Sequence, residues 1–259
     1  MGNRNRHVPG VENWAKTAQT EHASLDLKQI IAPSYSEALN PQMESDGAGL
    51  ASALAYIASD HPARFKDLLD ALRSVIPSVE DIRFPRARVV RPESEIVTVD
   101  GKTYTRQSKR VFWGNAMEFD FQGASRIPAH MVSEGTLLVL ALLTALMGPA
   151  RPRLVLLDDL DRALHPQAQR DLVGLLRRLL DQASDLQIVA TSHSPYLLDQ
   201  LHPEEVRLTT IKDDGSVACA GLNQHPEFER WKETMAPGEF WSFVGEAWVA
   251  EVGAREWQP

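Results

Sequence analysis

Arg153-Leu-Val-Leu-Leu-Asp158-Asp159-Leu160-Asp161 is the stretch that decides the fold: an apolar run that ends in three carboxylates within four residues. A short, continuous apolar run predicts a strand buried on both faces, as in a parallel sheet. Leu186 to Thr191 is a second such run, and Pro166 to Leu180 between them has the apolar spacing of an amphipathic helix. Strand, helix and strand in this order indicate a parallel α/β layer.

The carboxylates that follow the first strand predict a ligand site, because open α/β sheets bind ligands beyond the carboxyl ends of their strands. Asp158, Asp159 and Asp161 would repel one another there, and a divalent cation would relieve the repulsion. Carboxylate oxygens are hard ligands that suit Mg²⁺. The alternative is a solvated turn whose acids only cap the next helix.

Two further motifs flank this strand in the sequence. Ser133-Glu-Gly135-Thr136 precedes the apolar helix expected to end at Met147, and its open backbone N–H groups could bind an anion. His193, in Thr-Ser-His-Ser-Pro after the second strand, could hydrogen-bond a terminal phosphate or an attacking water. Taken alone, each motif is more often a plain cap.

The order and spacing of the three motifs resemble those of the ABC-type ATPases. Ser133 to Thr136 resembles their signature motif, Leu154 to Asp159 their Walker B strand, and His193 their switch histidine. Leu164-His-Pro and His193-Ser-Pro are similar to bacterial AAA-type ATP-binding proteins allied to recombination-repair and SMC ATPases, including those of phage-defence systems. The resemblance covers most of residues 45 to 250.

This resemblance implies a P-loop NTPase-like (ABC-type) α/β fold that binds ATP and Mg²⁺ at the interface of a homo- or hetero-dimer. It assigns Asp158 to Mg²⁺, Asp159 to activation of the attacking water and His193 to the terminal phosphate. Ser133 and Gly135 would bind the partner's nucleotide, and Asp161 is a lesser candidate in the dimer loop. The implied function is ATP binding and hydrolysis as a conformational switch, coupled to an effector protein in DNA maintenance or phage defence.

Two departures from the family pattern leave alternatives open. Gly-x-x-x-x-Gly-Lys-Ser/Thr does not occur in the chain, and Asp46-Gly-Ala-Gly-Leu-Ala-Ser52 has no lysine and predicts a helix start. We therefore expect an N-terminally incomplete domain, from a truncated or separately encoded part. Asp159 stands where the pattern usually has the longer glutamate. The alternatives are a degenerate pseudo-ATPase that serves as a structural partner, and a metal-dependent phosphodiesterase that combines Asp158, Asp159 and Asp161 with Glu118 and Asp120.

The rest of the chain predicts an antiparallel insertion and a helical tail around this core. Apolar spacing from Gly49 predicts two helices, broken at Asp60-His61-Pro62 and ended by Pro77. Alternation then predicts antiparallel strands with a hairpin turn at Asp100-Gly101, and a second hairpin turns at Asp213-Asp214-Gly215. We expect two main divisions: a loosely ordered lead-in over residues 1–45, with a short helix near Ser36–Leu39, and a C-terminal lobe over residues 46–259. The lobe is expected to contain a β insertion (79–128), a signature-bearing core (129–222) and a helical, Trp-rich tail (223–259).

Composition limits the partners and the compartment. The 35 acidic and 27 basic residues give a net charge of −8, which excludes a uniformly basic surface for nucleic acid. A contact with DNA through a local strip stays open, although the interleaved acids Glu93, Glu95 and Asp100 favour a solvated sheet face. One cysteine, no leader and no apolar run near the ~20 residues of a membrane span indicate a cytoplasmic protein without a membrane partner. The strip consists of Arg83, Arg86, Arg88, Arg91, Arg106, Lys109 and Arg110.

Overall fold

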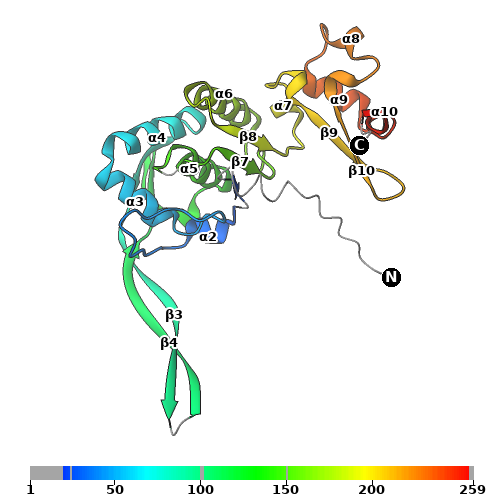
Figure 1. Ribbon diagram of the computed structural model, residues 1–259. Coiled ribbons are helices and arrows are strands. Elements are labelled where there is room, and N and C mark those ends of the chain that lie inside the picture. Colours follow the sequence, from blue (N-terminus) through cyan, green and yellow to red (C-terminus); the bar gives the residue numbers. More distant parts are fainter. Residues whose placement is uncertain (1–19, 24, 100–101, 150, 257–259) are drawn as a thin grey trace. The chain divides into compact units, whose positions relative to one another are not determined.

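The computed structural model describes residues 20–23, 25–99, 102–149 and 151–256 (Figure 1). The chain divides into two compact units, which are described separately. The first unit comprises Met1–Asp158 and Gln182–Ala190, and the second comprises Asp159–Asp181 and Thr191–Pro259. The boundary therefore falls inside residues 129–222, which we expected to form one core. No helix within these described ranges is long and apolar enough to span a membrane.

A parallel sheet of the first unit contains the apolar strand Leu154–Leu157, which precedes Asp158 and Asp159. Its order is β1 (Thr20–Ala23), β7 (Leu154–Leu157), β8 (Gln187–Ala190), and both pairings are parallel, as predicted for β7 and β8. Among the strands of this sheet that the structure describes, only β7 has a strand on each side, and Leu154, Val155 and Leu157 are buried. The prediction that β8 is also buried is wrong: β8 is an edge strand of this sheet over the described residues, and Val189 is 58% exposed.

Helices of the first unit surround α5 (Glu134–Met147), which is buried along almost its whole length. It contacts α2 (Leu27–Ile31), α3 (Leu50–Asp60) and α4 (Pro62–Val75). A helix that is apolar all round needs such cover on several sides. The predicted break between α3 and α4 is confirmed, with Pro62 at the first position of α4, where its missing N–H costs no hydrogen bond.

Antiparallel strands occupy residues 79–128, as predicted. One sheet has the order β2 (Val79–Arg83), β5 (Glu118–Phe121), β6 (Ala124–Pro128), followed by the short 3-10 helix η1 (Ala129–Met131). The other is a hairpin of β3 (Arg86–Val99) and β4 (Lys102–Asn115), whose long strands can be followed in Figure 1. The turn predicted at Asp100-Gly101 lies outside the described residues.

The described part of the lead-in, residues 20–23 and 25–45, contains β1 and α2. Asp26 caps α2 by accepting a hydrogen bond from the Lys28 N–H at 2.8 Å. The helix expected near Ser36–Leu39 is absent, and this prediction is wrong. The preceding residues are instead held against the hairpin: Ser34 forms an antiparallel bridge with Asn115, and the Tyr35 ring stacks on Phe112.

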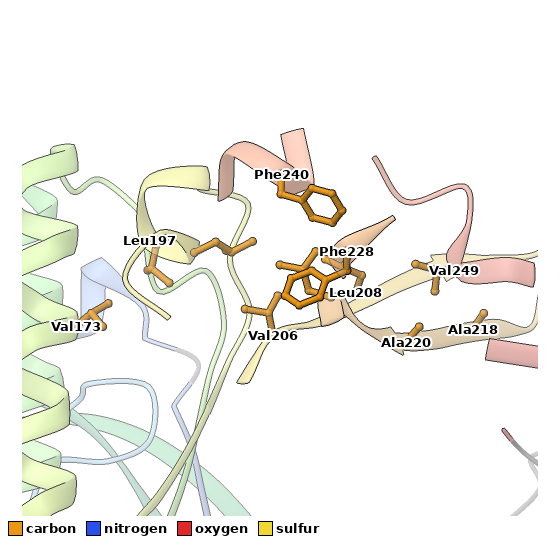
Figure 2. Close-up of a cluster of buried hydrophobic side chains, with 11 residues drawn as sticks. Val173, Leu197, Val206, Leu208, Ala218, Ala220, Phe228, Phe240 and Val249 are labelled. Carbon is orange, nitrogen blue, oxygen red and sulfur yellow. The ribbon is translucent and has the colours of Figure 1, made fainter. Parts of the chain in front are cut away.

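The second unit has its own hydrophobic core (Figure 2). The predicted hairpin, β9 (Arg207–Ile211) with β10 (Val217–Gly221), is confirmed, and α10 (Val249–Glu256) packs on it. The remaining elements are α6 (Pro166–Gln182), α7 (Pro195–Leu198), η2 (Pro203–Glu205), η3 (Leu222–Gln224), α8 (Phe228–Trp231) and α9 (Pro237–Val244). The buried cluster consists of Val173, Leu197, Leu198, Val206, Leu208, Ala218, Ala220, Leu222, Phe228, Phe240 and Val249.

Candidate functional site

The loop after β7 begins with the exposed acids Asp158 and Asp159. Asp159 has φ +52°, in the left-handed region that aspartate tolerates better than most residues. In this conformation its N–H donates to Thr191 Oγ1 at 2.9 Å, and the Leu160 N–H donates to the Thr191 carbonyl at 3.0 Å. Two adjacent hydrogen bonds therefore join the loop after β7 to the residue that follows β8.

Asp161 makes a second link between the same two loops. Its Oδ1 accepts hydrogen bonds from Ser192 Oγ at 2.5 Å and from the His193 N–H at 3.2 Å. The half-buried carboxylate thus fixes the backbone at His193, while the imidazole itself is exposed and has no hydrogen-bond partner among the described residues. Asp161, expected as a lesser candidate in the dimer loop, has a positioning role in the second unit.

Gln169 is a part of this arrangement that the sequence analysis missed. Its Oε1 accepts from Ser194 Oγ at 2.5 Å and its Nε2 donates to the Leu164 carbonyl at 2.9 Å. Both Gln169 and Ser194 are buried, so each must find a partner inside the protein. The signal in the sequence is a polar residue that lies among the apolar positions of the helix from Pro166. Gln169 holds the Leu164-His-Pro turn and the His193-Ser-Pro turn together.

The segment that resembles the signature motif begins α5, as predicted. Ser133 is the N-cap: its Oγ accepts from the Thr136 N–H at 3.4 Å and shares a 2.7 Å hydrogen bond with Thr136 Oγ1. Ser133 is exposed, whereas Gly135 and Thr136 are buried. This segment and Asp158 belong to the first unit, whereas Asp159, Asp161 and His193 belong to the second.

The donor set fits a magnesium ion that is shared with phosphates. No group of three or more His, Cys, Asp or Glu side chains that could hold a metal ion occurs in the part of the chain that the structure describes. Mg²⁺ commonly takes only one or two carboxylates from the protein and completes its shell with substrate phosphates and water. Asp158, exposed at the end of a parallel strand, supplies a carboxylate of that kind.

Asp120, one of the carboxylates of the phosphodiesterase alternative, is used differently. Asp120 is buried and accepts from Arg83 Nε at 2.7 Å and from the Arg126 N–H at 2.8 Å. The hydrogen bond from Arg83, together with that from the Arg126 backbone, holds the pKa of Asp120 below its ordinary value. Asp120 therefore stabilises the β2–β5–β6 sheet, and this engagement argues against a metal-binding role for it.

Comparison with known families identifies the class of protein. The model of the family described as "AAA domain, putative AbiEii toxin, Type IV TA system" matches residues 3–199. The chain belongs to this family of AAA domains, which confirms the resemblance to AAA-type ATP-binding proteins. The match includes Ser133, Asp158, Asp159 and His193.

A more particular relative is the Septu protein PtuA of Bacillus thuringiensis, which is 35% identical over 79 residues. That match covers 30% of this chain and 19% of PtuA, so the chain matches about a fifth of the relative's length. Two solved structures, both 10% identical to this chain, are more distant. An SMC ATPase from a study of ATP-driven dimerization and DNA-stimulated activation has a TM-score of 0.39, and the match covers 70% of this chain and 96% of that one. An SMC head bound to the C-winged helix domain of ScpA has a TM-score of 0.45, and the match covers 77% of this chain and 54% of that one.

Proposed function

We propose that the chain binds MgATP and hydrolyses it as part of an ATP-dependent conformational switch. Membership of the AAA family supports the proposal that the ligand is ATP. The observation that carries the proposal is the double link between the loops after β7 and β8, made by Thr191 and Asp161. It holds Asp159 and His193, an exposed acid and an exposed imidazole, in two loops that cannot move independently.

Each residue has a chemical role under this proposal. Asp158 would hold Mg²⁺, and the ion would supply charge stabilisation to the phosphates. Asp159 orients the attacking water and accepts its proton, and His193 hydrogen-bonds the terminal phosphate. The N-terminus of α5, with Ser133 and Gly135, binds the nucleotide of a second subunit through its backbone N–H groups.

A second subunit or segment completes the nucleotide site. Gly-x-x-x-x-Gly-Lys-Ser/Thr is absent from the printed sequence, so the phosphate-binding loop comes from elsewhere or is replaced. This favours a homo- or hetero-dimer with ATP at the interface. The same absence is the observation that favours the second candidate, a pseudo-ATPase that has kept the fold as a structural partner.

The biological role we propose is phage defence. The relationship to the Septu protein PtuA and the resemblance to ATPases of phage-defence systems support it. In this role the nucleotide state of the switch would control an effector protein.

Magnesium-dependent hydrolysis of ATP tests the assignment of Asp159. We expect Asp159→Asn to lower turnover by about a hundredfold or more, because a general base contributes at least that much, while ATP binding is retained. Asp213→Asn is the matched control, since Asp213 is exposed in the β9–β10 turn of the same unit. Turnover unchanged in Asp159→Asn would remove Asp159 from its role. ATP binding without any turnover in the unaltered chain would favour the pseudo-ATPase.

A further inference from the structure

The register of the β3–β4 hairpin sorts its side chains onto two chemically different faces. Pairing runs without a shift from Arg86 opposite Asn115 to Val99 opposite Lys102. Successive residues of a strand alternate between faces, and directly opposed residues share one. We call one set the outer face and the other the inner face. The outer face includes Arg86, Arg88, Val90, Pro92, Lys109, Val111, Trp113 and Asn115, and the inner face includes Ala87, Val89, Arg91, Arg110, Phe112 and Gly114.

The inner face is covered near the base of the hairpin. The Tyr35 ring stacks on Phe112 with centroids 4.6 Å apart, and the Arg91 guanidinium lies 5.7 Å from the Tyr35 centroid. A Cβ on Gly114 would lie 2.1 Å from the Ser34 carbonyl oxygen, so the backbone there leaves no room for a side chain. The inner face is therefore a structural contact of the first unit.

The outer face is exposed although it carries large apolar side chains. Trp113 is 59% exposed, Val90 53% and Val111 43%. Arg86, Arg88 and Lys109 are exposed beside them, and none of the three forms an ion pair with another described residue. Exposed apolar side chains that gather on one face mark an interaction surface.

Glu93 and Glu95, two of the acids that alternate with this strip in the sequence, have the opposite parity in the register. Glu93 and Glu95 are paired with Ser108 and Arg106, which are register positions of the inner set. The sequence interleaves acids and bases, but the register separates Glu93 and Glu95 from Arg86 and Arg88. Among the residues whose side chains the structure describes, the outer face carries Arg86, Arg88 and Lys109 and no acid, in a chain whose net charge is −8.

Trp113 also lines a hollow at the base of the hairpin that is rich in aromatic rings. The hollow has a volume of about 660 Å³, and Tyr35, Tyr56 and Phe84 line it together with Trp113. The Arg86 guanidinium lies 5.7 Å from the Trp113 centroid. Cations that track phosphates, together with aromatic rings on which bases stack, are the two features of single-strand binding sites. A duplex does not offer this contact, because the faces of its bases are already stacked on one another.

We propose that the outer face of the β3–β4 hairpin binds single-stranded nucleic acid. Arg86, Arg88 and Lys109 contact successive phosphates, and Trp113 at the hollow stacks on an unpaired base. This inference is independent of the proposed function, because it involves none of the residues assigned to ATP.

Fluorescence anisotropy of a labelled oligonucleotide of about twenty thymidines, measured with the full chain in the absence of ATP, tests the proposal. We expect binding that weakens as salt rises, with the logarithmic slope reduced by about 0.7 for each phosphate contact removed. Arg88→Ala with Lys109→Ala should lower both affinity and slope. Trp113→Ala should lower affinity by about 5- to 150-fold, the range measured for loss of base stacking, and Trp113→Phe should restore most of it.

Arg64→Ala is the matched control, because Arg64 is an exposed cation on α4, outside the hairpin. It should leave the affinity and the salt slope unchanged. The proposal is overturned by absence of binding at low salt, by an equal loss in Arg64→Ala, or by full affinity in both Trp113→Ala and the double variant. A duplex of the same length that binds as tightly as the single strand would overturn the stacking role of Trp113.

Discussion

The two hairpins of the molecule use the same antiparallel pairing in different surroundings. In β9–β10, Leu208 lies opposite Ala220 on a face that is buried in the core of the second unit. In β3–β4, Val90 lies opposite Val111 and both are exposed. Two paired strands alone are at best marginally stable, so β9–β10 is held by its core and β3–β4 by the contacts at its base. Apolar residues on the outer face of β3–β4 therefore do not serve the core.

The largest expected effect is loss of the core beneath β9–β10. Phe240 is 2% exposed and makes edge contacts with His225 and Phe228 at centroid distances of 5.1 and 5.9 Å. Phe240 and Phe228 are labelled in Figure 2. Phe240→Ala should lower the free energy of unfolding of the second unit by about 3–5 kcal/mol, measured by urea denaturation. Phe243→Ala on the same helix is the control, and at 63% exposure it should change stability by less than about 1 kcal/mol. Equal effects would contradict the assignment of Phe240 to the core.

A smaller effect is expected at the base of β3–β4. Gly114→Ala would push β4 away from Ser34 and weaken the two 2.9 Å hydrogen bonds between Ser34 and Asn115. We expect a loss of about 1–3 kcal/mol and faster amide exchange at Ser34 and Asn115. Gly174→Ala is the contrast: its Cβ would meet only Arg178 Nη1 at 3.8 Å, and alanine favours the helix. If the Ser34 and Asn115 amides stay protected from exchange in Gly114→Ala, the base of the β3–β4 hairpin is not held by the contact between Gly114 and Ser34.

The core of the second unit should also depend on pH. His225 lies 4.9 Å from Trp248 and 5.1 Å from Phe240 between ring centroids, and burial lowers its pKa below the ordinary 6.5, with a weaker opposing effect of Glu227. The unfolded state therefore binds a proton more readily, so this contribution to stability is complete above pH 6.5 and is lost as pH falls below it.

Denaturation midpoints between about pH 8 and pH 5.5 measure this contribution, and His225→Phe should flatten their dependence. His130→Gln, at an exposed residue of the first unit, should leave this pH dependence unchanged. The carboxylate of Glu205 acts in a lower window: the hydrogen bond from Arg177 lowers its pKa, so its contribution is lost only as pH falls below the ordinary 4.5. A pH profile unaltered by His225→Phe would show that the histidine is not the responsible group.

The smallest effect on stability is expected on the outer face of β3–β4. Trp113→Ala should change the free energy of unfolding of the first unit by less than about 1 kcal/mol, because the ring is mostly exposed and loses only the contact with Arg86 and part of the hollow. A loss comparable to that of Phe240→Ala, measured in the same denaturation experiment, would make Trp113 a core residue and remove the contrast between the hairpins.

Local patterns were sufficient to predict most elements of the fold. The Pro62 break, the Ser133 cap and the pairing of β7 with β8 follow from proline chemistry, capping chemistry and apolar runs. Tertiary contacts decided the rest. Residues 36–39 follow a segment held extended by Ser34 and Tyr35. Among the described strands β8 lies at the edge of its sheet, which its composition does not reveal.

The candidate site was predicted as a set of residues but not as a connected structure. Asp158, Asp159 and His193 follow parallel strands, which the apolar runs indicated. The link through Thr191 depends on the positive φ of Asp159, and the roles of Asp161 and Gln169 depend on loops that meet only in the folded chain. Side-chain hydrogen bonds between segments distant in the sequence leave no periodic signal.

Calorimetric titration of the purified chain with MgATP, beside Asp158→Ala and the control Asp213→Ala, tests the central claim most directly. We expect binding that is at least tenfold weaker in Asp158→Ala and unchanged in Asp213→Ala, because only Asp158 is assigned to the magnesium ion. Binding that Asp158→Ala leaves unaltered would contradict the assignment of the magnesium ion to Asp158, and no binding of MgATP up to millimolar concentration would contradict the claim that this chain binds ATP without a separate phosphate-binding loop.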